Sequence, residues 1–387
     1  MYDFETVVNR STQGSGKWMS LSEEEVKRGV IPYSVADMEF KVAPEIIEGL
    51  KAHLDTDILG YTIPTDEYFK AVCSFLKRHH DIETKKEDIL LTPGVVTALF
   101  HSVAAFTELG DEVAILTPVY YPFSMVINQQ KRTLVTSELI YENGKYTIDF
   151  EDLEKKLSSE KCKLMIFCSP HNPVGRVWTK EEVEKIAELC AKHNVYLISD
   201  EIHMDLMMPG YTHYSAALCE TYRDNIMICT SCSKTFNLAG MQVSNLLVFN
   251  EERREQLRAV LQLNHIGMLN NLSYKALILA YTKCDAWMEA MLAKINENRL
   301  LVKKYVEEKL PMIKVVELQG TYLQWLDLRA YNLTKEELEK KMTSHSLYLD
   351  EGYLFGEGGI GFERINLACP THKIQEFLER LNQALSE

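Results

Sequence analysis

The sequence predicts an α/β protein with a mostly parallel sheet. Between about residues 89 and 250, short apolar runs alternate with segments of helical periodicity, which is typical of strands that are buried on both faces. The length of 387 residues suggests about two domains of roughly 100–200 residues each. Residues 284–309 contain no Gly or Pro and predict one long amphipathic helix, which we expect to join the sheet domain to a smaller C-terminal domain.

Six apolar runs are the candidate strands of this sheet. They are Ile89–Thr92, Val113–Leu116, Leu164–Cys168, Val195–Ser199, Ile226–Thr230 and Asn245–Phe249. Two capping-box patterns, Thr179–Glu182 and Thr334–Glu337, predict helix starts, because a Thr and a Glu three residues apart satisfy each other's backbone N–H groups.

Charge and hydropathy exclude several classes of protein. The 42 Lys and Arg against 56 Asp and Glu give a net charge of −14, and no dense basic stripe is present, so we expect no nucleic-acid partner. No apolar run approaches the roughly 18 residues of a membrane span, and the first ten residues lack a signal-like apolar core. We therefore expect a cytoplasmic protein without a membrane partner.

The cysteine pattern favours reduced thiols. Nine cysteines are an odd number, scattered through predicted strands and helices, where thiols act as small apolar side chains. Cys229 and Cys232 form a C-x-x-C pair, which can be a redox pair or half of a zinc site, but no second pair with ligand spacing follows. We expect two packed thiols and no metal.

Polar and aromatic residues follow the candidate strands, where ligands of parallel sheets bind. A turn at Gly94 leads into a helical segment, whose N-terminus suits a phosphate but equally well only starts a helix. Tyr120 could stack on a planar ring or only cover the sheet edge. Asn172 lies in a loop rich in Pro and Gly. Either the loop fixes Asn172 as a hydrogen-bond donor to a ligand, or it is only a stable turn.

Two charged residues end the next strands. Asp200 follows a buried strand and needs a cation, since a buried carboxylate is costly alone. Lys234 lies among small polar residues and is either a solvated surface lysine or a desolvated, nucleophilic amine. The combination fits one ligand, pyridoxal 5'-phosphate (PLP), which has a phosphate, a planar ring, a basic ring nitrogen for Asp200 and an aldehyde for Lys234.

With these residues, the sequence resembles the fold-type I PLP-dependent enzymes of the class I/II aminotransferase superfamily. It is most similar to the cystathionine β-lyase (carbon–sulfur lyase) branch, named after MalY and PatB. The strings that carry the resemblance are Val35–Phe40, Gly60–Thr62, Ser169–Gly175, Asp200–Asp205, Ser231–Gly240 and Arg364–Pro370. The resemblance implies a mostly parallel seven-stranded sheet in a large PLP-binding domain at residues 51–284. It also implies a smaller α/β domain from residues 1–50 and 285–387.

The resemblance implies a cofactor-binding role for individual residues. Lys234 would be the catalytic residue that binds the PLP aldehyde covalently, and Asp200 would pair with the ring nitrogen. Tyr120 would stack on the ring, and Asn172 would hydrogen-bond its 3' oxygen. His203 stands where many aminotransferases have a Tyr, so its contact is left open. The residues expected around the phosphate are Val95, Val96, Ser231 and Ser233, with Tyr61 from the neighbouring subunit.

The phosphate site departs from a common pattern. Many aminotransferases have an arginine soon after the lysine, where this sequence has Met241 and Gln242, so backbone N–H groups, hydroxyls and Tyr61 must suffice. For the substrate, Arg364 would bind the carboxylate with its planar fork. Asp37, Tyr120 and Asn172 are the other expected substrate contacts.

The resemblance implies a β-lyase acting on sulfur amino acids. We expect α,β-elimination of L-cystathionine or a related cysteine S-conjugate to pyruvate, ammonia and a thiol, in a homodimer with active sites at the subunit interface. Transamination on the same scaffold is the alternative, since fold and cofactor residues do not separate the two reactions. A regulatory protein that retains the PLP fold is the third hypothesis.

Overall fold

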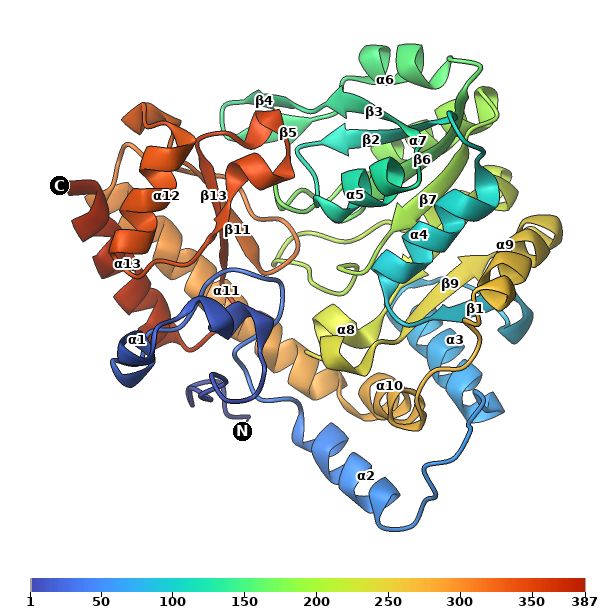
Figure 1. The fold of residues 1–387 in the computed structure, drawn as a ribbon, viewed down its shortest axis with the longest axis horizontal. Coiled ribbons are helices and arrows are strands. Elements are labelled where there is room, and N and C mark those ends of the chain that lie inside the picture. The colour runs from blue at the N-terminus through green and yellow to red at the C-terminus, as the bar shows by residue number, and fades with distance from the viewer. Residues whose placement is uncertain (1, 387) are drawn as a thin grey trace.

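The computed structural model describes residues 2–386 and contains two main sheets (Figure 1). The larger sheet has seven strands in the order β1-β9-β8-β7-β6-β2-β3. Its strands are β1 (Ile89–Thr92), β2 (Glu112–Thr117), β3 (Thr133–Glu138), β6 (Cys162–Cys168), β7 (Tyr196–Asp200), β8 (Ile226–Thr230) and β9 (Ser244–Val248). Strands β3, β2, β6, β7 and β8 are parallel, and β9 is antiparallel to both β8 and β1.

Helices cover both faces of the larger sheet. Along β2, Val113 and Ile115 pack in one core cluster while Ala114 and Leu116 pack in the other, because successive side chains of a strand point to opposite faces. The first cluster contains residues of α4 (Val95–Phe106), α5 (Pro122–Gln129) and α9 (Glu251–Leu263). The second contains residues of α3 (Asp66–His80), α6 (Phe150–Leu157), α7 (Lys180–Lys192) and α10 (Asn271–Lys283).

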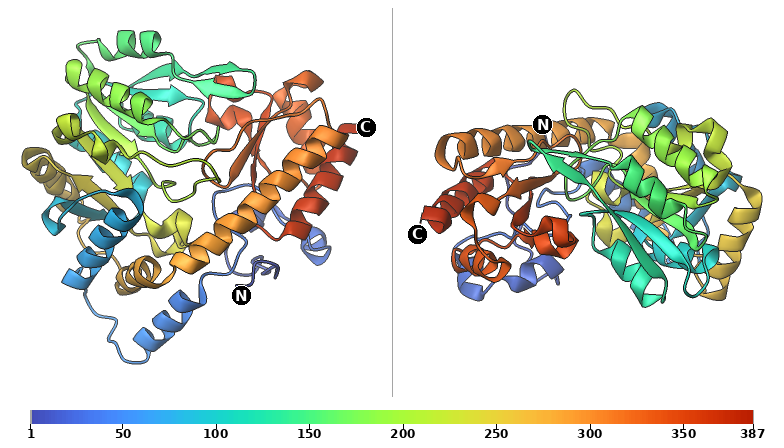
Figure 2. Two further views of the ribbon diagram at one scale, coloured as in Figure 1. Left: turned by 180° about the vertical axis from the view of Figure 1, so that it is seen from behind. Right: turned by 90° about the horizontal axis from the view of Figure 1, so that it is seen from above.

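The smaller sheet is antiparallel, in the order β10-β11-β13-β12. Its strands are β10 (Lys314–Val315), β11 (Leu323–Asp327), β12 (Asp350–Glu351) and β13 (Phe362–Asn366). The helices α12 (Lys335–Ser344) and α13 (Thr371–Ser386) lie beside it (Figure 1). The long helix α11 (Asp285–Lys309) runs between the two sheet regions (Figure 2).

The N-terminal segment lies against the smaller sheet region. The backbone N–H of Tyr33 donates to the carbonyl of Tyr348, and the N–H of Asn366 donates to the carbonyl of Tyr33. The remaining α-helices and strands are the short helix α1 (Glu23–Lys27), α2 (Pro44–Leu54), the hairpin β4 (Ile140–Glu142) and β5 (Lys145–Thr147), and α8 (Cys232–Thr235). The division into residues 1–50, 51–284 and 285–387 stays a prediction.

The elements expected from the sequence agree closely with this fold. All six apolar runs are strands, residues 285–309 form one helix, and both capping boxes are present at Thr179 and Thr334. The seventh strand, β3, was not predicted, since it lies at the edge of the sheet and its residues are mostly polar or partly exposed. Within residues 2–386, no helix combines the length and the apolar character needed to cross a membrane.

Glu363 is a buried acid whose carboxyl should reduce stability at neutral pH. Its side chain is buried in β13 and its Oε2 has no hydrogen-bond partner. Burial, with a smaller contribution from the nearby Glu351, raises the pKa of Glu363 well above its usual value. A carboxyl whose pKa is higher in the folded state stabilises the fold fully below about pH 4, near its unfolded pKa, and loses this contribution as the pH rises.

We therefore expect Glu363→Gln to be more stable than the wild type at high pH. At pH 8 the melting temperature should rise by about 2 °C or more, because the amide carries no charge to desolvate. At pH 4 the two proteins should melt close together. Thermal unfolding followed by circular dichroism across this range measures the difference. An unchanged or lower melting temperature at pH 8 would contradict the assignment.

Candidate active site

A cavity of about 270 Å³ lies at the carboxyl ends of the parallel strands. In chain order, its lining residues are Ala36, Pro93, Gly94, Val95, Val96, Thr97, Tyr120, Cys168, Asn172, Asp200, Ile202, His203, Ser233, Lys234, Ala239 and Gln242. The loops that follow β1, β2, β6, β7 and β8 all contribute to it, as expected where loops converge at one edge of a parallel sheet. The structure therefore brings most of the expected site residues into one cavity.

Lys234 lies on the short helix α8, directly after β8. Its Nζ donates a hydrogen bond of 2.7 Å to the carbonyl of Ala36. Burial, together with the positive charge of Arg364, lowers the pKa of Lys234 to about 8. A lysine with such a pKa has about a tenth of its amine in the neutral, nucleophilic form at pH 7, far more than an exposed lysine has.

The helix that carries Lys234 is tied to the loop after β7. The hydroxyl of Thr235 donates to Asp205 Oδ2 at 2.5 Å, and His80 Nε2 lies 2.6 Å from Asp205 Oδ1. At the other end of α8, Ser231 is the N-cap and accepts a hydrogen bond from the N–H of Ser233. These contacts fix the backbone from which Lys234 extends.

Asp200 is the last residue of β7 and is buried. Its Oδ1 accepts one backbone hydrogen bond, from Ile202 N–H at 3.2 Å. Burial outweighs this bond and the charge of Lys234 and raises the pKa of Asp200 to about 7. The adjacent Glu201 differs from Asp200 in having several partners. Its carboxylate accepts hydrogen bonds from the hydroxyl of Ser199 and the N–H of Ala216, and it lies 2.9 Å from His213 Nε2. A ligand cation in the cavity would keep Asp200 ionised.

Arg364 adjoins the cavity through Asn172, which lines it. Arg364 Nη1 donates to Asn172 Oδ1 at 2.7 Å, and Nη2 donates to Asp350 Oδ2. The guanidinium lies over the ring of Phe355, and its Nε is buried without a partner. The N–H of Tyr120 donates to the carbonyl of Asn172 at 3.0 Å. This arrangement holds a buried planar cation that suits a carboxylate.

The N-terminus of α4 offers a site for an anion. Gly94 is its N-cap with a φ of +100°, and no atom lies within 4 Å of where a Cβ would be. The first N–H groups of a helix have no intrahelical partner, and no side chain caps this helix. Val95, Val96, Thr97 and Gln242 line the cavity beside this end. A phosphate can therefore accept hydrogen bonds here and interact with the positive end of the helix dipole.

These residues fit PLP. Asp200 is a buried acid in the cavity without a paired cation, and His203 Nδ1 is buried without a hydrogen-bond partner. The cavity also holds an amine of lowered pKa and a helix N-terminus open to an anion. PLP has a matching group for the acid, the amine and the helix end.

Four expected site residues lie outside the lining of this cavity. Arg364 adjoins it through Asn172, and Ser231 lies behind Ser233, with the two Oγ atoms 2.7 Å apart. Asp37 forms ion pairs with Arg10 and Lys17 and lines a neighbouring cavity of about 660 Å³. Tyr61 is fully exposed on the surface.

Ala36, Gln242 and Asp350 are among the residues of the site that were not predicted from the sequence. Ala36 lies within the string 35–40 but has an apolar side chain, and only its carbonyl takes part. Gln242 lines the cavity in a left-handed backbone conformation, with a φ of 52°. Its position eight residues after Lys234 was the one sequence feature that could have indicated this role. Asp350 pairs with Arg364 from a segment without a recognisable motif.

The C-x-x-C pair is buried and carries no sign of a metal site. Cys229 and Cys232 are both free thiols with no exposed surface, and burial raises the pKa of each, that of Cys232 to about 12. Residues 2–386 contain no group of three or more His, Cys, Asp or Glu side chains that could hold a metal ion. The two thiols are packed in the core.

The chain is similar to known proteins along nearly its whole length. A family model described as aminotransferase class I and II matches residues 28–381. The chain is 39% identical to cystathionine β-lyase PatB of Bacillus subtilis, covering 96% of this chain and 97% of PatB. It is 30% identical to the protein MalY of Escherichia coli, covering 100% and 99%. The crystal structure of cystalysin from Treponema denticola, which contains PLP, matches with a TM-score of 0.96 and 45% identity over 100% and 99% of the two chains.

Proposed function

Because the chain belongs to the aminotransferase class I and II family, we propose that it is a PLP-dependent carbon–sulfur β-lyase. Its substrate is L-cystathionine or a related cysteine S-conjugate, and its products are pyruvate, ammonia and a thiol. The single observation that carries the proposal is the presence of a low-pKa lysine, Lys234, and an unpaired buried acid, Asp200, in one cavity. Relatives named cystathionine β-lyase support this choice of reaction.

PLP, when bound, supplies a conjugated ring that takes up the electron pair left at the substrate Cα. Asp200 would hold a positive charge at the ring nitrogen, and Asn172 and His203, which line the same cavity, would position the ring. Arg364 binds the substrate carboxylate through charge-assisted hydrogen bonds. Together these residues would orient the substrate so that its Cα–H bond faces Lys234.

Lys234 has two tasks in this reaction. Its amine would hold the cofactor between turnovers, and as the free amine it would take the proton from the substrate Cα. The Cβ–S bond then breaks and its electron pair leaves with sulfur, which is released as a thiol. Water hydrolyses the remaining three-carbon fragment to pyruvate and ammonia.

An assay without an added 2-oxo acid tests the proposed function. The PLP-loaded protein should release pyruvate and homocysteine from L-cystathionine in equal amounts. Transamination needs a 2-oxo acid to complete its cycle, so product formation without one distinguishes the two reactions. If turnover occurs only with a 2-oxo acid and yields a new amino acid, the protein is an aminotransferase. A visible cofactor band without turnover of any β-substituted amino acid would favour a regulatory role.

We further propose that the protein is a homodimer with active sites at the subunit interface. A surface segment exposes apolar side chains at Ile58, Leu59, Tyr61 and Ile63, and Tyr61 is fully exposed. An apolar segment of this size is typical of an interface. In the dimer, Tyr61 would reach the phosphate of the cofactor bound to the partner subunit. It would take part of the role of the phosphate-binding arginine, which this chain lacks after Lys234. The nine free thiols support a cytoplasmic location.

Subunit complementation should reveal the role of Tyr61. We expect Tyr61→Ala to bind PLP about tenfold more weakly, because one phosphate hydrogen bond is lost. A hybrid dimer of Tyr61→Ala and Lys234→Ala chains has one site with both native residues and should recover activity that neither parent has at low PLP concentration. Fluorescence titration of PLP and pyruvate release measure the two effects. If the hybrid stays as inactive as its parents, Tyr61 does not act across subunits.

A further inference from the structure

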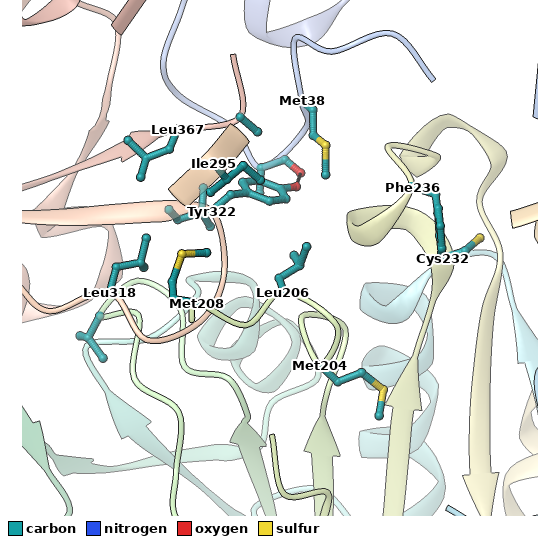
Figure 3. Close-up of a cluster of buried hydrophobic side chains, with 14 of the residues drawn as sticks. Met38, Met204, Leu206, Met208, Cys232, Phe236, Ile295, Leu318, Tyr322 and Leu367 are labelled. Carbon is teal, nitrogen blue, oxygen red and sulfur yellow. Dashed lines mark hydrogen bonds between the residues drawn. The ribbon is translucent and has the colours of Figure 1, made fainter. Parts of the chain in front are cut away.

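Two buried donors converge on one backbone carbonyl in the candidate active site. Lys234 Nζ donates to the carbonyl of Ala36 at 2.7 Å, and Tyr322 Oη donates to the same oxygen at 2.9 Å. Tyr322 has no exposed surface, and its ring lies edge-on to His203, with centroids 6.1 Å apart. Figure 3 shows Tyr322 in a buried cluster with Met38, Leu206 and Ile295, where three parts of the chain meet. The carbonyl accepts both bonds through its two lone pairs.

The segment that presents this carbonyl is strained and held from several sides. Val35 has a φ of 55°, a conformation that is unfavourable for a β-branched residue and persists only where its surroundings hold it. Asn366 Nδ2 donates to the carbonyls of both Val35 and Asp37, and Asn237 Oδ1 accepts from the N–H of Met38 at 3.0 Å. The fold thus places the intervening Ala36 carbonyl at a fixed position beside Lys234.

We propose that the Ala36 carbonyl holds the Lys234 amine whenever this amine is not bound to the cofactor, and that Tyr322 is a positioning residue acting through that carbonyl. The inference rests on the proposed function, because that reaction frees the amine in every turnover. An amine that donates one N–H to Ala36 keeps its lone pair available to accept a proton. The carbonyl therefore limits where the base lies while it acts.

Tyr322 also affects the charge on the amine. Its hydroxyl proton points at the oxygen that Lys234 uses, so the positive end of the hydroxyl dipole lies near the amine and disfavours its protonated form. The charged groups that act on Lys234 from the surrounding elements are Arg364, Asp37, Asp200 and Lys17. Removing the Tyr322 hydroxyl leaves these four charged groups in place. The Ala36 carbonyl then accepts a hydrogen bond from the Lys234 amine alone, which favours the protonated form of this amine.

Tyr322→Phe tests this inference, because it keeps the ring and removes only the hydroxyl. We expect kcat for L-cystathionine to fall roughly threefold at pH 7, the loss of neutral amine that a half-unit rise in its pKa causes, with KM within about twofold, since the bonds to the substrate carboxylate are unchanged. The acidic limb of the kcat profile should move to higher pH, so that much of the rate returns at pH 9. In the apoprotein, the pKa of Lys234, measured by competitive acylation and mass spectrometry of its peptide, should rise by about half a unit.

Tyr33→Phe is the matched control. Tyr33 is also fully buried and donates to a backbone carbonyl, that of Lys373 at 2.6 Å, so it loses an equivalent hydrogen bond outside the cavity. Its pH profile and Lys234 labelling should match the wild type. The inference is wrong if Tyr322→Phe and Tyr33→Phe behave alike, or if the rate loss is the same at every pH. Absence of pyruvate release by the wild type would instead contradict the proposed function itself.

Discussion

Replacement of Lys234 by alanine is expected to reduce pyruvate release from L-cystathionine by a factor on the order of 10³ or more. In the proposed reaction Lys234 supplies both the covalent attachment of the cofactor and the base, and a positioned base alone contributes about 10²–10⁴ in rate. Lys234 is the one lysine among the residues that line this cavity, and its pKa is lowered to about 8. Steady-state assays with excess PLP measure the loss.

Lys303→Ala is a suitable control for Lys234→Ala. Lys303 is an exposed lysine on α11, so its loss should leave both PLP binding and turnover unchanged. The Lys234→Ala protein should still hold PLP noncovalently, because the helix N-terminus and Asp200 remain. Pyruvate release at the wild-type rate by Lys234→Ala would show that another residue is the base.

Asp200→Asn should give the second largest effect, a decrease in kcat of about 10²–10³ together with weaker PLP binding. Removing one partner of a buried ion pair costs about 3–5 kcal/mol, and an amide does not keep the ring nitrogen charged. The raised pKa of Asp200, about 7 in the protein alone, should fall when the cationic ring is bound. Turnover of the wild type should therefore persist below pH 7.

The control for Asp200→Asn is Asp66→Asn, which changes a carboxylate that is 90% exposed and does not line the cavity. This control should retain full activity. The kinetics should be measured with PLP well above the dissociation constant of each variant, so that weaker binding does not lower the rate. An Asp200→Asn protein with wild-type kcat under these conditions would exclude the proposed ion pair with the ring nitrogen.

The sequence predicted the parts of the site that follow strands. Tyr120, Asn172, Asp200 and Lys234 each come shortly after an apolar run, and the ends of parallel strands meet at one edge of a sheet. Local sequence patterns alone therefore predicted that these four side chains lie close together. Strand β3 escaped prediction because an edge strand buries little and needs no continuous apolar run.

The contacts that depend on chain segments far apart were not predictable in this way. Ala36 and Tyr322 lie far from Lys234 in sequence, and Ala36 acts through its backbone oxygen. Asp350 precedes Arg364 by 14 residues and meets it across two strands. No periodicity or spacing encodes such a meeting, because it depends on how the N-terminal segment and the smaller sheet pack against the larger one. The resemblance identified Arg364, but its partners became clear only from the fold.

The covalent state of Lys234 provides the most direct measurement. After borohydride reduction of the protein incubated with PLP, mass spectrometry of its peptides should find the phosphopyridoxyl group on the peptide that contains Lys234 and on that peptide alone. Prior incubation with L-cystathionine should leave this result unchanged once the substrate is consumed. An unmodified Lys234 peptide in protein saturated with PLP, or a phosphopyridoxyl group on another lysine, would contradict the account.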